Sequence, residues 1–293
     1  MKITVITPSF NQGRYLEETI QSVLSQQYEQ LEYIIIDGGS SDDSPAIIRK
    51  YASSLHYWTS EPDRGQTHAI NKGLQQAGGD VIHWVNSDDL MAEGSLQAIA
   101  DAFADPSVMA FCGRSFIFGG QHEQYSSSPR GSLPYMFSKA QVDQPSTVFR
   151  REVYQHIQLD ESLHYAMDLD LWFAFLCRYG NTHIAYSDSL LLKFREHESS
   201  KTVSRQDEML AERILLAEKW KQKILHKDLP ATDPSVESQK KEICAGLSDF
   251  QAYQLLHSPY LSAEQRKNLL AAISTRHLAW RSRLELLKLR LSL

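Results

Sequence analysis

A cluster of polar and acidic side chains follows an apolar run in the first third of the chain. Residues 81–85 read Val-Ile-His-Trp-Val, and Asn86-Ser87-Asp88-Asp89 come directly after them. Such a run predicts a buried strand, and open α/β sheets bind ligands beside the carboxyl ends of their strands. Carboxylate oxygens suit a divalent cation that keeps coordination positions free for phosphate. The segment therefore predicts a site for a cation and a phosphorylated ligand, although a plain polar turn has a similar composition.

Further acids stand where other predicted strands end. Asp37 closes the apolar run 31–36, and Asp63 lies in the following inter-strand loop. A lone acid at such a position is a common turn former. In a parallel sheet, however, the carboxyl ends of the strands share one edge. We therefore expect these two carboxylates to converge with Asp88 and Asp89.

The elements that must position these residues alternate in type. Apolar, β-branched runs predict strands, and apolar residues at helical spacing predict helices. Their alternation at short spacing indicates an α/β fold with a parallel sheet and right-handed crossovers. The expected strands cover residues 3–7, 31–36, 57–60, 81–85 and 108–118, and the expected helices cover 15–26, 45–51, 67–76, 95–103 and 168–179.

The later part of the chain has a different character. Residues 119–135 are rich in Ser, Gly, Pro and Gln and predict a flexible loop. After about residue 204 strand-like runs vanish and helical patterns dominate, and residues 228–238, which contain two prolines, predict a linker. We expect an α/β domain over residues 1–204 and a helical C-terminal extension over residues 205–293.

The composition argues against several classes of protein. Of the 293 residues, 42% are hydrophobic and 23% charged, which allows a substantial core, and the net charge of −6 gives no support for nucleic-acid binding. The three cysteines form no CxxC pair, so neither a zinc site nor a disulfide framework is indicated. The N-terminal apolar run is too short for a signal peptide, and no stretch reaches the ~18 apolar residues of a membrane-spanning helix. We expect a cytoplasmic protein.

Motifs of three common folds are also absent. The first predicted strand leads into Thr7-Pro8-Ser9-Phe10-Asn11-Gln12-Gly13, which lacks the GxGxxG pattern of dinucleotide-binding folds. The chain contains no GxxxxGK[ST] motif of P-loop proteins and no GxSxG motif of hydrolases. The acids at the strand ends therefore remain the main candidates for a site.

The order and spacing of four segments resemble glycosyltransferase family 2, over roughly residues 1–200. This resemblance implies a GT-A fold, in which helices flank a Rossmann-like, mostly parallel sheet, and a catalytic domain over residues 1–204. It also implies inverting transfer of a sugar from a nucleotide-diphospho-sugar, a UDP-sugar being favoured, with Mn²⁺ or Mg²⁺ as the usual cofactor. The segments are Thr7-Pro8-Ser9-Phe10-Asn11-Gln12, Ile36-Asp37-Gly38-Gly39-Ser40-Ser41-Asp42, Asp63-Arg64-Gly65-Gln66 with Ala69-Ile70-Asn71-Lys72-Gly73, and Asn86-Ser87-Asp88-Asp89.

The resemblance assigns several residues to the nucleotide. Pro8 and Ser9 stand where the family's first loop lines the base and ribose. Asp37 matches the carboxylate that accepts a hydrogen bond from the nucleobase, a role that a carboxylate can fill for uracil or guanine. Asp63 and Arg64 occupy a loop that approaches the nucleotide. Arg64 either neutralises the diphosphate or forms a surface ion pair.

The same resemblance places a metal ion beside residues 86–88, where the family usually has Asp-x-Asp. Asn86 replaces the first acid and can bind a ribose or sugar hydroxyl without adding charge. Asp88 matches the residue that holds the metal, and Asp89 is adjacent and can support it or contact the nucleotide sugar. His197, in a segment like the family's Arg-x-His, is a candidate ligand of the cation or the diphosphate, or else a structural residue. With one acid fewer, the metal requirement is open.

The general base is matched to Asp168, which begins a helix similar to the family's Glu-Asp-x-x-Leu segment. Inverting transfer needs a carboxylate that takes the proton of the acceptor hydroxyl. Asp170 is the alternative but points elsewhere on the helix, and either acid could simply favour the helix dipole. The Glu of the motif is Met167 here. Lys201 is matched to a phosphate contact, and Gln144-Pro145-Ser146 resembles a stretch on the acceptor side.

The last segment, from residue 264, lies outside the resemblance. Its apolar residues alternate with Arg and Lys, which predicts an amphipathic helix on a membrane surface, or a helix packed on the domain or on a second subunit of a homo-oligomer. The membrane interpretation suits a lipid-linked sugar as acceptor. It would place the protein on the cytoplasmic face of the inner membrane, in cell-surface polysaccharide or glycolipid assembly.

Two other functions compete with the transferase. The substitutions at Asn86 and Met167 are also expected of a non-catalytic protein that retains the GT-A fold and binds a nucleotide sugar or glycan. A sugar nucleotidyltransferase would share the α/β pattern. That class should carry a glycine-rich basic loop after the first strand, and Gln12-Gly13-Arg14 is a poor version of it.

Overall fold

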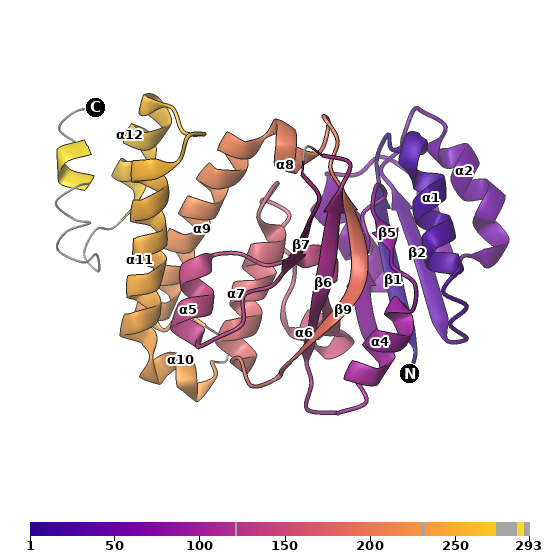
Figure 1. Ribbon diagram of the computed structural model, residues 1–293, viewed down its shortest axis with the longest axis horizontal. Helices are drawn as coiled ribbons and strands as arrows, with labels where there is room; N and C mark the ends of the chain where they lie inside the picture. Colours follow the sequence, from indigo (N-terminus) through magenta and orange to yellow (C-terminus); the bar gives the residue numbers. More distant parts are fainter. Residues whose placement is uncertain (121, 230–231, 274–285, 290–293) are drawn as a thin grey trace. The chain divides into compact units, whose positions relative to one another are not determined.

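The structure is a computed structural model that describes residues 1–120, 122–229, 232–273 and 286–289 (Figure 1). The chain folds into two compact units that interleave along the sequence. The first unit comprises residues 1–128, 143–164 and 183–197. The second unit comprises residues 129–142, 165–182 and 198–293.

The first unit contains a sheet that, among the described residues, has nine strands. The strand order is β3-β2-β1-β4-β8-β6-β9-β5, and β7 pairs with β6 outside this path. The strands are β1 (Ile3–Ser9), β2 (Leu31–Asp37), β3 (Tyr57–Ser60), β4 (Val81–Trp84), β5 (Leu90–Met91), β6 (Ala110–Phe118), β7 (Gln124–Ser127), β8 (Thr147–Arg150) and β9 (Ile184–Arg195).

The four strands β3, β2, β1 and β4 run parallel, as the alternating sequence pattern predicts. Their register aligns Ser9 with Asp37, and Asp37 with Ser60, at the carboxyl ends of the strands. Beyond β4 the sheet is mixed, because β8 is antiparallel to both β4 and β6 whereas β6 and β9 are parallel. The parallel half brings the predicted acids to one edge.

Helices cover the sheet of the first unit, and their apolar faces supply its core. In α1, Leu16, Ile20 and Val23 are buried at helical spacing, as expected of an amphipathic helix. Gly73 lets α3 approach β1, since a Cβ there would lie only 2.5 Å from Cγ2 of Ile6. The helices are α1 (Gly13–Leu24), α2 (Ser44–Tyr51), η1 (Ala52–Ser54), α3 (Gln66–Gln76), α4 (Ser95–Ala102), η2 (Gln144–Ser146) and α6 (Arg151–His156).

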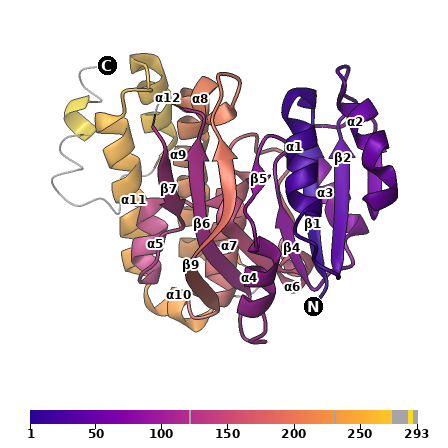
Figure 2. The ribbon, with the colours of Figure 1, turned by 45° about the vertical axis from the view of Figure 1, so that its right-hand side comes forward.

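The described residues of the second unit form helices and connecting loops, without a strand. In α7 the side chains of Trp172, Phe173 and Phe175 are buried. The ring of Phe173 stacks on Phe137 of α5, with ring centroids 4.9 Å apart. α11 and α5 lie side by side in both views (Figures 1 and 2). Gly246 of α11 allows this close packing, because a Cβ there would lie 2.9 Å from Cβ of Ser138. The helices are α5 (Leu133–Lys139), α7 (Met167–Tyr179), α8 (Lys201–Ser204), α9 (Gln206–His226), α10 (Pro234–Ser238), α11 (Lys240–His257) and α12 (Ala263–Ala272).

The prediction of a flexible loop over residues 119–135 is wrong. This stretch contains β7, which pairs with β6 in antiparallel register, and the start of α5. Leu133 begins the helix with a proline in its first turn and is buried on its apolar face. Neither element could be predicted from the polar composition, because β7 is largely exposed and α5 is short.

The predicted linker is also partly helical. Within residues 228–238, α10 begins at Pro234, and the Asp233 side chain caps it by accepting a hydrogen bond from the Ser235 amide. Residues 129–142 and 165–182 pack with the C-terminal helices, and the domain boundary at residue 204 stays a prediction.

The basic amphipathic tail falls largely on residues 274–285 and 290–293, which lie outside the described residues. Among the helices that the structure does describe, none combines the length and apolar character needed to cross a membrane.

Candidate functional site

Asp37 ends β2 and is fully buried. Its carboxylate accepts hydrogen bonds from the Ser40 amide (3.0 Å), the Ser40 hydroxyl (2.5 Å) and the Ser60 hydroxyl (2.7 Å). An ionised carboxylate has about four acceptor positions. Neighbouring residues thus hold Asp37 in a fixed orientation and leave it capacity for one further donor, such as a nucleobase N–H.

The end of β1 and the start of the loop after it lie beside Asp37. Pro8 and Ser9 are buried, and the Ser9 carbonyl accepts a hydrogen bond from the Gly38 amide at 2.8 Å. The Ser9 hydroxyl is buried without a hydrogen-bond partner among the described residues. Phe10, which the sequence analysis did not assign, has 61% of its side chain exposed, so it offers an aromatic ring for stacking next to the Asp37 turn.

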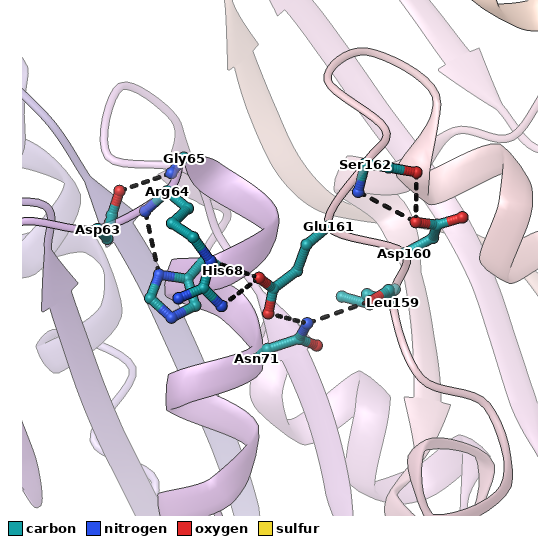
Figure 3. Close-up of polar contacts among 9 residues, drawn as sticks. All are labelled: Asp63, Arg64, Gly65, His68, Asn71, Leu159, Asp160, Glu161 and Ser162. Atoms are coloured by element: carbon teal, nitrogen blue, oxygen red, sulfur yellow. Dashed lines mark hydrogen bonds and ion pairs between the residues drawn. The ribbon is translucent and has the colours of Figure 1, made fainter.

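The loop after β3 packs on the same turn. A Cβ on Gly38 would lie 2.8 Å from Oδ2 of Asp63, and Asp63 accepts a hydrogen bond from the Gly65 amide at 2.7 Å. Arg64 donates from Nε (3.1 Å) and Nη2 (2.5 Å) to Oε2 of Glu161 (Figure 3). The structure thus shows Arg64 in the surface ion pair, one of its two predicted roles, and only tertiary contacts reveal Glu161.

Asn86 lies in a network of side-chain amides. Its Oδ1 accepts from Gln66 Nε2 at 2.8 Å, while its Nδ2 donates to Asp89 Oδ2 at 3.1 Å and to Gln144 Oε1 at 3.4 Å. Gln144 in turn donates to the Trp84 carbonyl at the end of β4. A carboxylate at position 86 could accept from Gln66 but could not donate to Asp89. The feature of the sequence that points to this network is Asn86 itself, which replaces the first acid of the family's Asp-x-Asp pattern.

Asp88 and His197, both predicted metal residues, meet in the structure. Nε2 of His197 lies 3.0 Å from Oδ2 of Asp88, although 109 positions separate them in the sequence. The imidazole ring packs on Tyr15 with centroids 4.7 Å apart. Arg195, at the end of β9, donates from Nε to the Asp88 carbonyl at 2.9 Å and places its guanidinium over Tyr15. Tyr15 was not predicted as a site residue from the sequence, and Arg195 was noted only as part of a motif.

Asp89 supports this loop from inside. It is fully buried, Oδ1 accepts from the Arg195 amide at 2.9 Å, and Oδ2 accepts from Asn86. Burial, followed by the neighbouring charge of Asp88, raises the pKa of Asp89 well above its usual value. Asp89 thus holds the Asn86–Asp88 turn against the end of β9.

The side chains near Asp88 fit a metal cation that has few protein ligands. Among the described residues, no group of three or more His, Cys, Asp and Glu side chains could form a complete metal site. Asp88 and His197 present one carboxylate and one imidazole close together. This pair suits a divalent cation that takes its remaining ligands from water and phosphate oxygens.

In the second unit, Asp168 lies half-buried in the first turn of α7. Burial raises the pKa of Asp168 to about 6, and the charge of Arg213 acts in the opposite direction. Lys201 is exposed, with its ammonium 5.9 Å from the ring of Tyr165, and it interacts electrostatically with Asp168. A carboxylate with a pKa near neutrality is suited to general-base catalysis.

Asp170, the alternative base, is committed to the helical packing. It is buried, and its Oδ1 accepts a hydrogen bond from Trp220 Nε1 at 2.7 Å. This contact between α7 and α9 supports the preference for Asp168. Arg213, a residue without a local sequence signal, donates to the Ala140 carbonyl at 2.6 Å.

Comparison with solved structures defines the class of fold. TarS residues 1–349 of S. aureus, in complex with UDP-GlcNAc, has a TM-score of 0.72 and 17% identity, covering 99% of this chain and 88% of that one. The mannosyltransferase PcManGT of Pyrobaculum calidifontis, in complex with GDP-Man and Mn²⁺, has a TM-score of 0.59 and 19% identity, covering 98% and 79%. The fold is GT-A, as predicted.

The chain belongs to glycosyl transferase family 2, whose model matches residues 4–156. Two uncharacterized glycosyltransferases, from Rickettsia typhi and Rickettsia prowazekii, are 28% and 27% identical over 221 and 216 residues. These matches cover 68% of this chain and 65% of each relative, so the chain spans just under two thirds of their length. The predicted family is confirmed.

Proposed function

We propose that this protein is an inverting glycosyltransferase that moves a sugar from a nucleotide-diphospho-sugar, preferably a UDP-sugar, to an acceptor hydroxyl. One observation carries the proposal: Asp37 and the Asp88–His197 pair lie at the carboxyl-terminal edge of the parallel strands in the first unit. Family membership supports it. The sugar nucleotides bound to TarS and PcManGT support the choice of donor class.

In this proposal the first unit binds the donor. Asp37 accepts a hydrogen bond from the nucleobase, with Pro8 and Ser9 beside it and Asp63 in the adjoining loop. Asp88 and His197 would hold Mn²⁺ or Mg²⁺, which would supply positive charge to the departing diphosphate. Asn86 and Asp89 keep Asp88 in place through the amide network and the end of β9.

Asp168 is the proposed general base. It takes the proton of the acceptor hydroxyl as that oxygen attacks the anomeric carbon on the face opposite the leaving group, which inverts the configuration. Its raised pKa supports this role, because a base that titrates near neutrality is both deprotonated and sufficiently basic at physiological pH. Lys201 adds positive charge beside it, for a phosphate group.

We also propose that the acceptor is a glycan or lipid-linked sugar of cell-surface polysaccharide or glycolipid assembly. The protein would act in the cytoplasm, on the inner face of the membrane if the basic tail binds lipid, or as a homo-oligomer if the tail packs on a second subunit. The amphipathic pattern after residue 264 supports both arrangements.

A specific observation also favours a second candidate, a non-catalytic protein that binds a nucleotide sugar or glycan. The Asn86 amide is fully engaged with Gln66, Asp89 and Gln144, and Met167 replaces the acid before Asp168. Donor binding without transfer to a broad set of acceptors, and without donor hydrolysis, would select this function.

The testing experiment is a thermal-shift panel of UDP, GDP, TDP, CDP and ADP, with and without Mn²⁺ or Mg²⁺. A ligand at a hundred times its Kd adds about 2.7 kcal/mol to the stability of the native state. We expect one nucleotide to stabilise the protein more strongly with the cation. Asp37→Ala should remove the nucleotide effect, and Asp88→Ala the cation effect. The control Asp188→Asn alters an acid with 98% side-chain exposure. Absence of any nucleotide response would refute the proposal.

A further inference from the structure

Arg64 and Glu161 form an ion pair beside the proposed nucleotide site (Figure 3). Nε and Nη2 of the guanidinium both donate hydrogen bonds to one carboxylate oxygen, Oε2 of Glu161. The other oxygen, Oε1, accepts from Asn71 Nδ2 at 3.1 Å. These donors lower the pKa of Glu161, Arg64 first and Asn71 second, so the pair is ionic at neutral pH.

The carboxylate is held in place from α3. Asn71 Nδ2 also donates to the Leu159 carbonyl at 3.1 Å, and Thr67 Oγ1 donates to the Leu163 carbonyl at 3.2 Å. Thr67 and Asn71 are four positions apart on α3, so they face the segment 159–163 from one side of the helix. Glu161 is therefore anchored independently of Arg64.

Arg64, by contrast, can leave its partner at little cost. Its side chain is 68% exposed, and its guanidinium has no other hydrogen-bond partner among the described residues. Gly65 follows with φ +112°, and no heavy atom lies within 4 Å of a Cβ built there, so the space beside the loop is open. The loop also packs on the turn after Asp37, through Asp63 and Gly38.

We propose that Glu161 is a positioning residue whose carboxylate binds the Arg64 guanidinium when no donor is present. Donor binding then requires Arg64 to leave the carboxylate and pair with the donor diphosphate. A carboxylate and a phosphate accept the same fork of N–H donors. Glu161 therefore competes with the diphosphate and sets the donor affinity. The inference rests on the proposed function, because it assigns the competing anion to the donor.

The expected change in donor affinity follows from the strength of the Arg64–Glu161 ion pair. Exposed ion pairs favour the paired state by about one- to fivefold, and apparent affinity falls in proportion to the fraction of competent protein. Glu161→Gln keeps an oxygen for Asn71 but removes the anion. We expect it to tighten the Kd for UDP about two- to sixfold, and less at high salt, because screening already weakens the exposed pair.

Isothermal titration calorimetry on the full chain tests this proposal by measuring the Kd for UDP. If another nucleoside diphosphate stabilises the wild-type protein, that nucleotide is used instead. Arg64→Gln should weaken binding, and Glu161→Gln should then have no further effect in the double variant. The matched control is Glu61→Gln, which removes a different carboxylate paired with Lys72 on the same helix and should leave the Kd unchanged.

A structural role for Glu161 would predict weaker or unchanged binding in Glu161→Gln, and that result would overturn the inference. Equal tightening in Glu61→Gln would also overturn it, since the cause would then be general loss of negative charge. If no nucleoside diphosphate binds the wild-type chain, the proposed function itself fails. Binding to wild type without tightening in the variant refutes only the role of Glu161.

Discussion

Replacing Asn86 by aspartate would restore the acid that the family usually carries, yet the structure predicts that it destabilises this protein. The Asn86 amide donates to Oδ2 of Asp89 at 3.1 Å. In Asn86→Asp, that donor becomes a carboxylate oxygen facing a buried carboxylate, while the contact from Gln66 at 2.8 Å can persist. The substitution therefore replaces one attraction by a repulsion inside the loop that holds Asp88.

The magnitude combines two terms. A hydrogen bond to a charged acceptor contributes about 1.5–3 kcal/mol, and repulsion between the two carboxylates adds to its loss. We expect the free energy of unfolding to fall by roughly 2–4 kcal/mol at pH 8. For a domain of this size, each 1 kcal/mol shifts Tm by about 2–4 °C, so differential scanning fluorimetry should show a decrease of at least about 4 °C.

The effect should depend on pH. Burial and the charge of Asp88 raise the pKa of Asp89 in the folded protein. The folded state therefore binds this proton more tightly than the unfolded state, and stability falls as pH rises from the unfolded pKa of about 3.9 through the folded one. A second carboxylate strengthens this trend, so the loss of Tm in Asn86→Asp should be smaller at pH 5 than at pH 8.

Asn86→Ala is the matched control, because it removes the hydrogen bond to Asp89, and also the contact from Gln66, without adding charge. Its loss of stability should therefore be similar at both pH values. The reasoning is refuted if Asn86→Asp is as stable as wild type at pH 8. It is also refuted if the loss in Asn86→Asp is independent of pH.

Two further predictions concern catalysis and packing. Asp168→Asn should reduce sugar transfer about 10²- to 10⁴-fold, the usual contribution of general-base catalysis, with unchanged Kd for UDP. The wild-type rate should rise with pH through about 6, because Asp168 must lose its proton to act; a transfer rate retained in the variant would remove Asp168 as the base. Gly73→Ala should lower stability by about 1–3 kcal/mol, because the new Cβ would meet Ile6 at 2.5 Å. Urea denaturation followed by circular dichroism measures this loss, and a variant as stable as wild type would show that α3 can shift away from β1.

Much of the first unit could be predicted from periodicity. Apart from β5 and η1, the strands and helices of residues 1–103 lie within a few residues of their expected positions, because apolar runs and helical spacing report burial directly. β7 and α5 escaped prediction, since their stability comes from pairing with β6 and packing on α11 rather than from a local pattern.

The candidate site divides in the same way. The sequence by itself determined that acids stand at the carboxyl ends of neighbouring parallel strands, because strand ends and turn residues are local features. Asp37 and Asp88 could be named on that basis. Asp63 could be named from its place in the loop after the next predicted strand, and Asp168 from the resemblance of its helix to a family segment.

Only the tertiary structure decided which of these residues touch. His197 reaches Asp88 because β9 runs parallel to β6 and ends beside the loop after β4, a path that no local spacing encodes. Gln144 reaches Asn86 across 58 positions, through a short helix beside β8. Arg64 faces Glu161 because α3 and the segment 159–163 lie together. Side-chain contacts between segments far apart in sequence depend on the packing of the sheet and its helices, and that packing is a property of the whole chain.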